Sequence, residues 1–243
     1  MSLGSTGSSS IKNTSPLQTS ESKWVGLQSI QWVDPTGKER HWESADRKTR
    51  KGEADAVAIC CLITRPSTRS DPDLLLVSQF RPPVKVSGGE TTSGLVVEMP
   101  AGLIDAGEEG KEGTQRAAMR ELAEETGYGS ADNLKNGSEQ LNVLTISPVM
   151  FNDPGMTGSN MRLSCIHIHL EKDDSPDPIA KPDEGEFIEK RLVKFNGLYD
   201  ELCRLQEQEN YAVDARLYHF AWGAKLSGMV GNLAGSGSDK GKI

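Results

Sequence analysis

The sequence predicts an α+β fold, and three features of the 243-residue chain indicate it. Two extended segments near the N-terminus are joined by a turn sequence. Several short apolar runs with β-branched residues, typical of buried strands, fill the middle of the chain. One strongly acidic helical segment lies among these runs, and two further helical segments close the chain, so strands and helices do not alternate strictly.

The first two extended segments, residues 23–33 and 38–44, are expected to form a β-hairpin. The sequence Asp-Pro-Thr-Gly at 34–37 separates them. Proline presets φ for a turn, and glycine accepts the left-handed conformation that follows. We therefore expect an N-terminal hairpin as an extension of the main domain.

The acidic helix is expected at residues 114–126, where Thr114 is a plausible N-cap and Gly127 occupies the position of a C-terminal cap. Hydrophobic patterning places the other elements. We expect strands at 54–64, 74–80, 95–100, 141–147, 161–170 and 187–193, and helices at 197–208 and 214–227.

Four segments are expected along the chain. Residues 1–22 are rich in Ser, Thr and Gly and have almost no large apolar side chains, which predicts a disordered tail. The Gly-rich residues 228–243 predict a second tail. Between them lie the hairpin region, 23–50, and a single domain, 51–227, long enough to bury a sizeable core.

Composition excludes several classes of partner. The formal net charge of −8 disfavours binding to nucleic acid or to anionic membranes, which attract basic surfaces. No run approaches the roughly 20 apolar residues of a membrane span. The four cysteines form neither a C-x-x-C pattern nor a disulfide framework, so we expect a reducing compartment. The expected location is the cytoplasm, with the nucleus as an alternative.

Cys165, His167 and His169 alternate along an expected strand, which would place three zinc-ligand types on one face of a sheet. The apolar residues between and after them explain the same alternation, because they would form the buried face. We favour this structural interpretation over a zinc site.

Three carboxylates lie within one and a half turns of the acidic helix. Glu121, Glu124 and Glu125 stand at i, i+3 and i+4, so their side chains emerge on one face. Such crowding is tolerated when a hard divalent cation lies between the carboxylates, and Mg²⁺ binds a few of these oxygens together with substrate phosphates. The run therefore predicts a metal site that handles a diphosphate. A solvated acidic face is the alternative, but it explains neither the preceding glycine loop nor Arg120 and Gly127.

The spacing of these residues resembles the signature of the Nudix hydrolases, G-x5-E-x7-R-E-U-x-E-E-x-G-U, where U is aliphatic. Gly102 and Glu108 match its first half, and residues 120–128 match or nearly match its second. Eleven residues rather than seven separate Glu108 from Arg120. We expect a four-residue insertion within 109–115, absorbed by a surface loop where the helix begins.

This resemblance implies an α/β/α sandwich built on a mixed sheet and hydrolysis of a diphosphate with bound Mg²⁺, or Mn²⁺ in its place. The implied metal ligands are Glu121, Glu125 and the main-chain carbonyl of Ala101. Glu124 would be a further or water-mediated ligand with a part in catalysis. Arg120 would orient the acids through ion pairs.

A general base is implied on the acidic loop at residues 182–187, which follows a strand and contains glycine, as a mobile lid does. The match of Gly185-Glu186-Phe187 to relatives selects Glu186. Asp183 and Glu184 lie beside it, so a solvated carboxylate remains the alternative.

Residues outside the signature resemble the ADP-ribose pyrophosphatase branch of the family, in particular its eukaryotic ADP-sugar pyrophosphatases. The resemblance is carried by residues 79–83, 100–108 and 153–155. It implies that Asp153 belongs to the substrate site. The proline that marks this branch lies further from the signature than usual, at Pro148, after a loop at 130–140. The resemblance extends over about residues 23–226.

The hairpin then acquires an implied role. Trp24 and Trp42 would sandwich an adenine, with the two rings coming from different subunits of a domain-swapped homodimer. Glu43 would bind the adenine edge, while Arg47 and Arg81 would donate to the diphosphate. The alternatives are that the tryptophans are core residues of the hairpin and that either arginine forms a surface ion pair.

The expected function is hydrolysis of ADP-ribose to AMP and ribose 5-phosphate. Two other classes of function stay open. One is a Nudix hydrolase of another nucleoside diphosphate derivative, such as an ADP-hexose, NADH or an oxidised nucleoside diphosphate. The other is a non-catalytic ADP-ribose binder, which the presence of all three acids disfavours.

Overall fold

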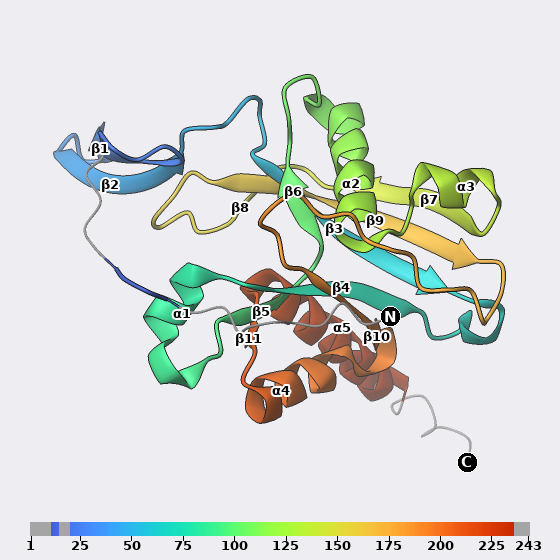
Figure 1. Ribbon diagram of the computed structural model, residues 1–243. Coiled ribbons are helices and arrows are strands. Elements are labelled where there is room, and N and C mark those ends of the chain that lie inside the picture. The colour runs from blue at the N-terminus through green and yellow to red at the C-terminus, as the bar shows by residue number, and fades with distance from the viewer. Residues whose placement is uncertain (1–10, 15–19, 236–243) are drawn as a thin grey trace, which may run out of the picture.

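The computed structural model describes residues 11–14 and 20–235. Within this part of the chain, nine strands form one mixed sheet between helices, and β1 and β2 form a separate hairpin (Figure 1). The main sheet has the order β11-β5-β4-β3-β9-β7, with β10 paired to β4, β6 to β3 and β8 to β9. The strands are β1 (Val25–Val33), β2 (Glu39–Arg47), β3 (Ala56–Thr64), β4 (Asp73–Phe80), β5 (Leu95–Glu98), β6 (Ala101–Leu103), β7 (Glu139–Ile146), β8 (Met150–Phe151), β9 (Asn160–Leu170), β10 (Glu189–Lys194) and β11 (Ala212–Val213). The α-helices are α1 (Pro82–Gly88), α2 (Gly110–Thr126), α3 (Ala131–Lys135), α4 (Leu198–Glu209) and α5 (Ala215–Gly235).

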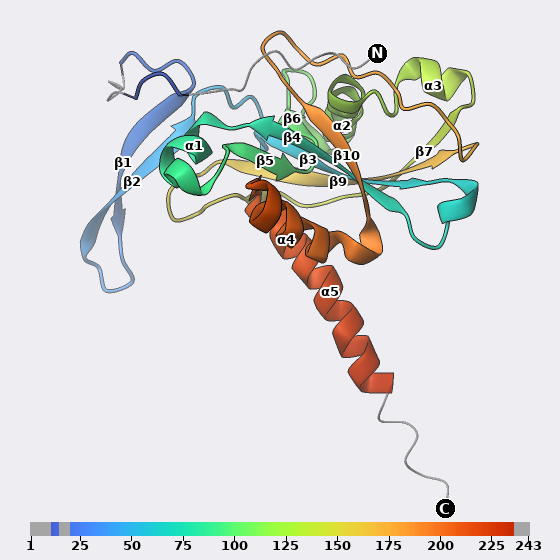
Figure 2. The same ribbon diagram turned by 60° about the horizontal axis from the view of Figure 1, so that its bottom comes forward.

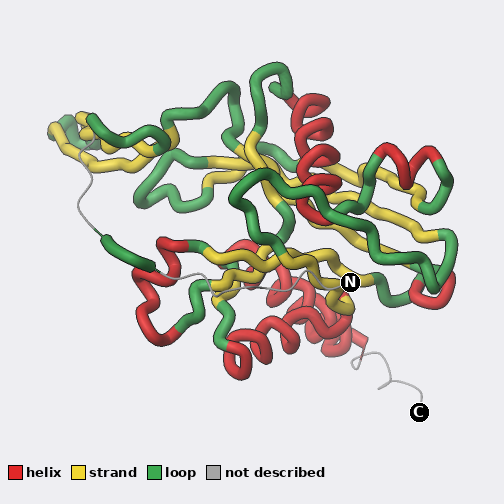
Figure 3. Tube along the Cα trace, in the orientation of Figure 1, coloured by secondary structure: helices red, strands yellow, loops and turns green. Residues whose placement is uncertain are grey.

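The central strand β3 supplies side chains to two separate cores. Ile59 and Cys61 belong to the core that contains Leu122 of α2, whereas Cys60 belongs to the core that contains Leu202 of α4. Successive strand residues point to opposite faces, so this division follows from the alternation of the strand. Helix α2 covers one face of the sheet, and α4 and α5 cover the other (Figures 1 and 3). The α/β/α sandwich on a mixed sheet is thereby confirmed.

The N-terminal hairpin is present and lies to one side of the main body (Figure 2). β1 and β2 pair antiparallel, from Val25 opposite Arg47 to Val33 opposite Glu39. In the turn, Asp34 accepts a hydrogen bond from the Thr36 amide at 2.9 Å, and Gly37 has φ of 84°. The turn chemistry expected from the sequence therefore forms this hairpin.

Helix α2 begins earlier than expected. It starts at Gly110, after Glu109, and Thr114 lies inside the helix with its hydroxyl donating to the Gly110 carbonyl at 2.7 Å. The assignment of Thr114 as N-cap and of the four-residue insertion to a surface loop is therefore wrong. Four residues make about one helical turn, so the extra residues lengthen the helix. The C-terminal assignment is confirmed, because Gly127 ends α2 in the left-handed conformation.

Three further helices depart from the prediction, and one of them, α3, lies within the segment expected as a loop at 130–140. Helix α5 continues to Gly235, so the part of the predicted C-terminal tail before residue 236 is helical. Helix α1 was not predicted, and Pro82 and Pro83 begin it, because proline fits the first turn where no amide hydrogen bond is needed. The tails assigned to 1–10, 15–19 and 236–243 lie outside the described residues.

Strand β9 buries the apolar face that its sequence predicted. Ile166, Ile168 and Leu170 are buried, whereas His167 and His169 both contact the hydroxyl of Thr64. This contact accounts for the two histidines without zinc. Among the described helices, none has the length and apolar character needed to cross a membrane.

Candidate active site

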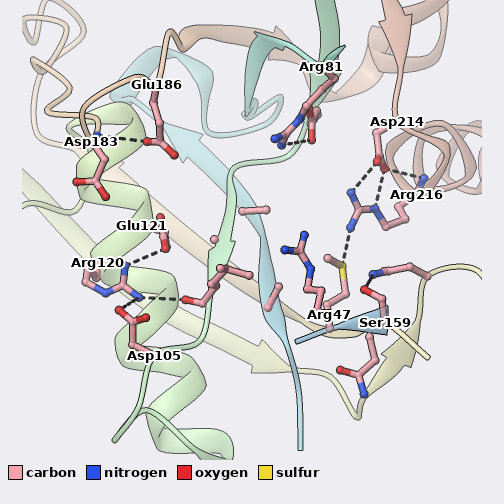
Figure 4. Close-up of a pocket in the computed structure, with 18 of the residues that line it drawn as sticks. Arg47, Arg81, Asp105, Arg120, Glu121, Ser159, Asp183, Glu186, Asp214 and Arg216 are labelled. Carbon is pink, nitrogen blue, oxygen red and sulfur yellow. Dashed lines mark hydrogen bonds and ion pairs between the residues drawn. The ribbon is translucent and has the colours of Figure 1, made fainter. Parts of the chain in front are cut away.

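A cavity of about 640 Å³ opens where the hairpin, the sheet and helix α2 meet (Figure 4). Its lining combines acidic side chains on one side with arginines on the other. Six of the residues singled out from the sequence line it: Arg47, Arg81, Ala101, Arg120, Glu121 and Glu186. The lining also includes Glu98, Gly102, Asp183, Asp214 and Arg216.

The acidic side is built by α2 against the loop that precedes it. The Glu121 carboxylate lies so close to Gly102 that an added Cβ there would fall 1.7 Å from the carboxyl carbon. Glu125 is buried and accepts a hydrogen bond from the Ala101 amide at 3.1 Å. The signature glycine therefore allows the helix acids to approach the backbone of β6.

Burial governs the charge of these acids. Burial raises the pKa of Glu125 to about 8, although the hydrogen bond from the Ala101 amide acts to lower it. Burial also raises the pKa of Glu121, against the opposing effect of Arg120. Repulsion from Glu186 is a smaller cause in both cases. The site thus holds carboxylates that gain from a nearby cation.

Arg120 joins the signature loop to the helix. Its guanidinium contacts Glu108 at 2.9 Å, Glu121 at 2.8 Å and Glu124 at 3.4 Å, and it donates to the Leu103 carbonyl at 3.1 Å. These hydrogen bonds, led by that to Glu108, raise the pKa of Arg120. Glu108 therefore reaches Arg120 despite the longer interval between them.

Two arginine–carboxylate pairs form the opposite side of the cavity. Arg81 binds Glu98 through two hydrogen bonds of 2.7 and 3.0 Å. Arg216 binds Asp214 through two more, of 2.8 and 2.6 Å. Arg47 lines the same side of the cavity, where its guanidinium can bind an anion.

Glu98, Asp214 and Arg216 were not singled out in the sequence. Glu98 could have been noticed, because it is a carboxylate at the end of the otherwise apolar strand β5. Asp214 precedes α5 and accepts hydrogen bonds from the amides of Arg216 and Leu217, which is an N-cap pattern.

Glu186 lies on the loop between β9 and β10, on the same side of the cavity as Glu121 of α2 (Figure 4). Its carboxylate accepts a hydrogen bond from the Asp183 amide at 3.3 Å. Asp183 also lines the cavity, whereas Glu184 does not. Of the neighbours that the sequence placed beside Glu186, Asp183 therefore shares the cavity with it and Glu184 does not.

The remaining predicted site residues lie outside the lining of this cavity. Trp24 is 68% exposed and Trp42 is 49% exposed, so the alternative that they are core residues is wrong. The Trp42 indole donates to the Gly155 carbonyl at 3.1 Å, which brings β2 beside the loop that carries Asp153. Glu43 is exposed on the same strand.

The acids of α2 are oxygen donors of the kind that a hard divalent cation prefers. Within the described part of the chain, no three His, Cys, Asp or Glu side chains already form a metal-binding group. Glu121 and Glu125 nevertheless suit such an ion, because Glu125 is buried, Glu121 is half-buried, and the protein compensates the charge of these oxygen donors only in part. Glu124 has a half-exposed side chain and lies further out.

The mixed sheet between helices and the acidic cavity beside α2 define the class of fold and site, and comparison with known proteins assigns the family. Residues 54–217 match the model of the NUDIX domain, and the chain belongs to the Nudix family of hydrolases. These enzymes generally use a divalent metal.

Several relatives extend over most of the chain. The Saccharomyces cerevisiae protein named ADP-ribose pyrophosphatase is 39% identical over 211 residues, covering 86% of this chain and 80% of its own length. The Mus musculus protein named ADP-sugar pyrophosphatase is 34% identical over 213 residues, covering 87% and 86%. An uncharacterized Nudix hydrolase of Schizosaccharomyces pombe is 36% identical over 214 residues, covering 88% and 91%.

Proposed function

We propose that this protein is a Mg²⁺-dependent hydrolase that converts ADP-ribose to AMP and ribose 5-phosphate. The observation that carries the proposal is one cavity with the carboxylates of Glu121 and Glu186 on one side and the guanidiniums of Arg47 and Arg81 on the other. A diphosphate fits between the two, because a cation held by the carboxylates and the arginine guanidiniums would both neutralise its oxygens. The names of the yeast and mouse relatives support an ADP-sugar as the substrate.

Each side of the cavity has its own task in this proposal. Glu121, Glu125 and the Ala101 carbonyl hold Mg²⁺, with Glu124 as a further ligand, and Mn²⁺ could take its place. When bound, the cation neutralises phosphate oxygens and lowers the pKa of water. Arg47 and Arg81 orient the diphosphate from the opposite side.

Glu186 is the proposed base. Its carboxylate accepts a proton from the attacking water while the water oxygen bonds to phosphorus and the bridging P–O bond breaks. AMP and ribose 5-phosphate are the two products. Arg120 keeps Glu121 and Glu124 in place through the ion pairs described above.

The function is tested by incubating the protein and Mg²⁺ with separate substrates and measuring AMP release. We expect a higher kcat/KM for ADP-ribose than for NADH or dinucleoside polyphosphates. An ADP-hexose belongs in the same series, because the mouse relative is named for ADP-sugars. A clear preference for NADH would contradict the proposal, and binding of ADP-ribose without any cleavage would indicate the non-catalytic alternative.

The hairpin region, residues 23–50, is proposed to bind adenine and to form a homodimer. The pairing of its strands supports a second subunit. The Lys48 amide donates a hydrogen bond to the Trp24 carbonyl at 2.9 Å, so Trp24 lies beside Lys48, which is six residues along the chain from Trp42. Six extended residues span about 20 Å, so the two rings of one hairpin cannot enclose the same base. Glu43 is then placed to bind the adenine edge, and Asp153 approaches from the adjacent loop.

Deleting residues 1–46 is expected to give a monomer without activity. The hairpin exposes large apolar side chains on a two-stranded sheet, which has little stability alone, and a second copy would cover them. Light scattering and the AMP assay measure the two effects. A deletion variant that is monomeric yet fully active would contradict the swapped dimer.

We also propose a cytoplasmic location, with the nucleus as an alternative. The four cysteines are all free, which supports a reducing compartment. Fractionation of cells that produce the tagged protein tests this, and recovery from the secreted fraction would contradict it.

A further inference from the structure

The segment that carries Glu186 is attached to the end of helix α2. We call residues 171–188, which connect β9 to β10, the strap; it crosses the C-terminal end of α2 (Figure 1). The Lys181 amide donates to the Glu124 carbonyl at 2.8 Å. A Cβ added at Gly127 would lie 2.7 Å from the Ile179 carbonyl oxygen, so the strap rests directly on the end of the helix.

One side chain ties these elements together. Lys190, on β10, donates to the Thr126 carbonyl at 3.0 Å and to the Pro178 carbonyl, and it forms a 2.9 Å ion pair with Asp177. Its ammonium also lies 5.3 Å from the centre of the Tyr128 ring. An ammonium has three N–H donors, and these three oxygens from α2 and the strap use all of them.

The charge of Lys190 also suits its position. Helix α2 has no basic residue in its last turn and carries Glu124 and Glu125 there. The C-terminal end of a helix has a partial negative charge from its free carbonyls, and a cation stabilises it. Lys190 supplies this cation from a different element, only 17% exposed to solvent.

We propose that Lys190 is a positioning residue that fastens the strap to the end of α2. Glu121 and Glu125 are on α2 and Glu186 is on the strap, so this attachment sets the separation between the metal-binding acids and the base. Lys190 itself is not among the residues that line the cavity and acts only through these elements. The inference rests on the proposed function in assigning the base to Glu186.

Lys190→Met keeps the length of the side chain and removes its three donors. We expect kcat for ADP-ribose to fall about 10-fold to 100-fold with little change in KM, because misplacement of a catalytic group by about 1 Å has effects of this size. Lys194→Met is the matched control. Lys194 is on the same strand, but its 2.8 Å ion pair is with Asp73 of β4 and not with the strap.

A double-mutant cycle separates positioning from a general loss of structure. If Lys190 acts through Glu186, adding Lys190→Met to Glu186→Gln should lower kcat by less than about 3-fold further. An equal loss in both backgrounds would overturn the proposal. Asp177→Asn provides a variant that spares the fold, because Asp177 is 67% exposed, and it should give a smaller loss with the same dependence on Glu186.

Hydrogen exchange gives a result that does not depend on substrate. The amides of Lys181 and Glu186, bonded to the carbonyls of Glu124 and Asp183, should exchange at least about 10-fold faster in Lys190→Met than in the wild type or Lys194→Met. Unchanged exchange would overturn the proposed attachment. If exchange is faster in Lys190→Met but the wild-type protein does not cleave ADP-ribose, the proposed attachment stands and the proposed function is contradicted.

Discussion

Replacing Glu125 with glutamine is expected to lower kcat for ADP-ribose by about 10²- to 10³-fold while the protein stays folded. The change keeps the shape of the side chain and can keep the hydrogen bond from the Ala101 amide. It removes one negative charge from the proposed metal site, and metal-assisted hydrolysis depends on several kcal/mol of such electrostatic stabilisation. Steady-state rates across a Mg²⁺ titration measure the loss, and circular dichroism checks the fold.

Glu112→Gln is the control for this variant. Glu112 lies on the same helix but is exposed at its first turn and does not line the cavity. It should retain the rate and the Mg²⁺ dependence of the wild type. Near-normal activity of Glu125→Gln with unaltered Mg²⁺ dependence would mean that these helix acids bind no essential metal.

A second measurement on Glu125→Gln uses the raised pKa of Glu125, about 8 in the protein without metal. A group whose pKa is raised on folding contributes stability that is fully present below its unfolded pKa and lost as pH rises through the folded value. Between about pH 5 and 8, the Tm of metal-free wild type should therefore fall more than that of Glu125→Gln. Saturating Mg²⁺ should remove the difference in slope, because the cation replaces the proton. Parallel slopes without metal would contradict this account.

Glu186→Gln is expected to lower kcat by about 10²- to 10⁴-fold with little change in KM. General-base catalysis acts in the transition state, so substrate binding should be nearly unaffected. Glu184→Gln serves as the matched control, since Glu184 is two residues away and outside the cavity lining. Both variants should be assayed at saturating ADP-ribose and Mg²⁺.

Glu184→Gln should remain near the wild-type rate. Equal modest losses in the two variants would indicate that the loop acts through its total charge. A severe loss confined to Glu184→Gln would mean that Glu184, and not Glu186, takes the proton.

The acidic side of the cavity could be predicted from the sequence because its residues are close together along the chain. Glu121 and Glu125 are one helical turn apart, and a glycine loop precedes them, so local spacing determines their arrangement. The hairpin was predictable for the same reason, since its turn sequence is local. The separation of Trp24 from Trp42 within one hairpin could not be predicted in this way, because it depends on the register of the two strands.

The arginine side could be predicted only in part. Arg47 and Arg81 were identified through resemblance, but the ion pair of Arg81 with Glu98 joins the residue after β4 to the last residue of the neighbouring strand β5. Arg216 reaches the cavity from the start of α5, more than a hundred residues from Arg81. No local pattern encodes such contacts, because they depend on how the strands and helices are assembled.

The interval between Glu108 and Arg120 is mostly helical, and this limits the lengths of insertion that the junction tolerates. Each helical residue turns the chain by about 100°, so four added residues return the start of α2 to within about 40° of its original direction. Two added residues would rotate that start to nearly the opposite side of the helix, away from the loop that holds Glu108. The contact of Glu108 with Arg120 therefore depends on helical phase more than on chain length, and insertions of whole turns are the changes this junction can accept.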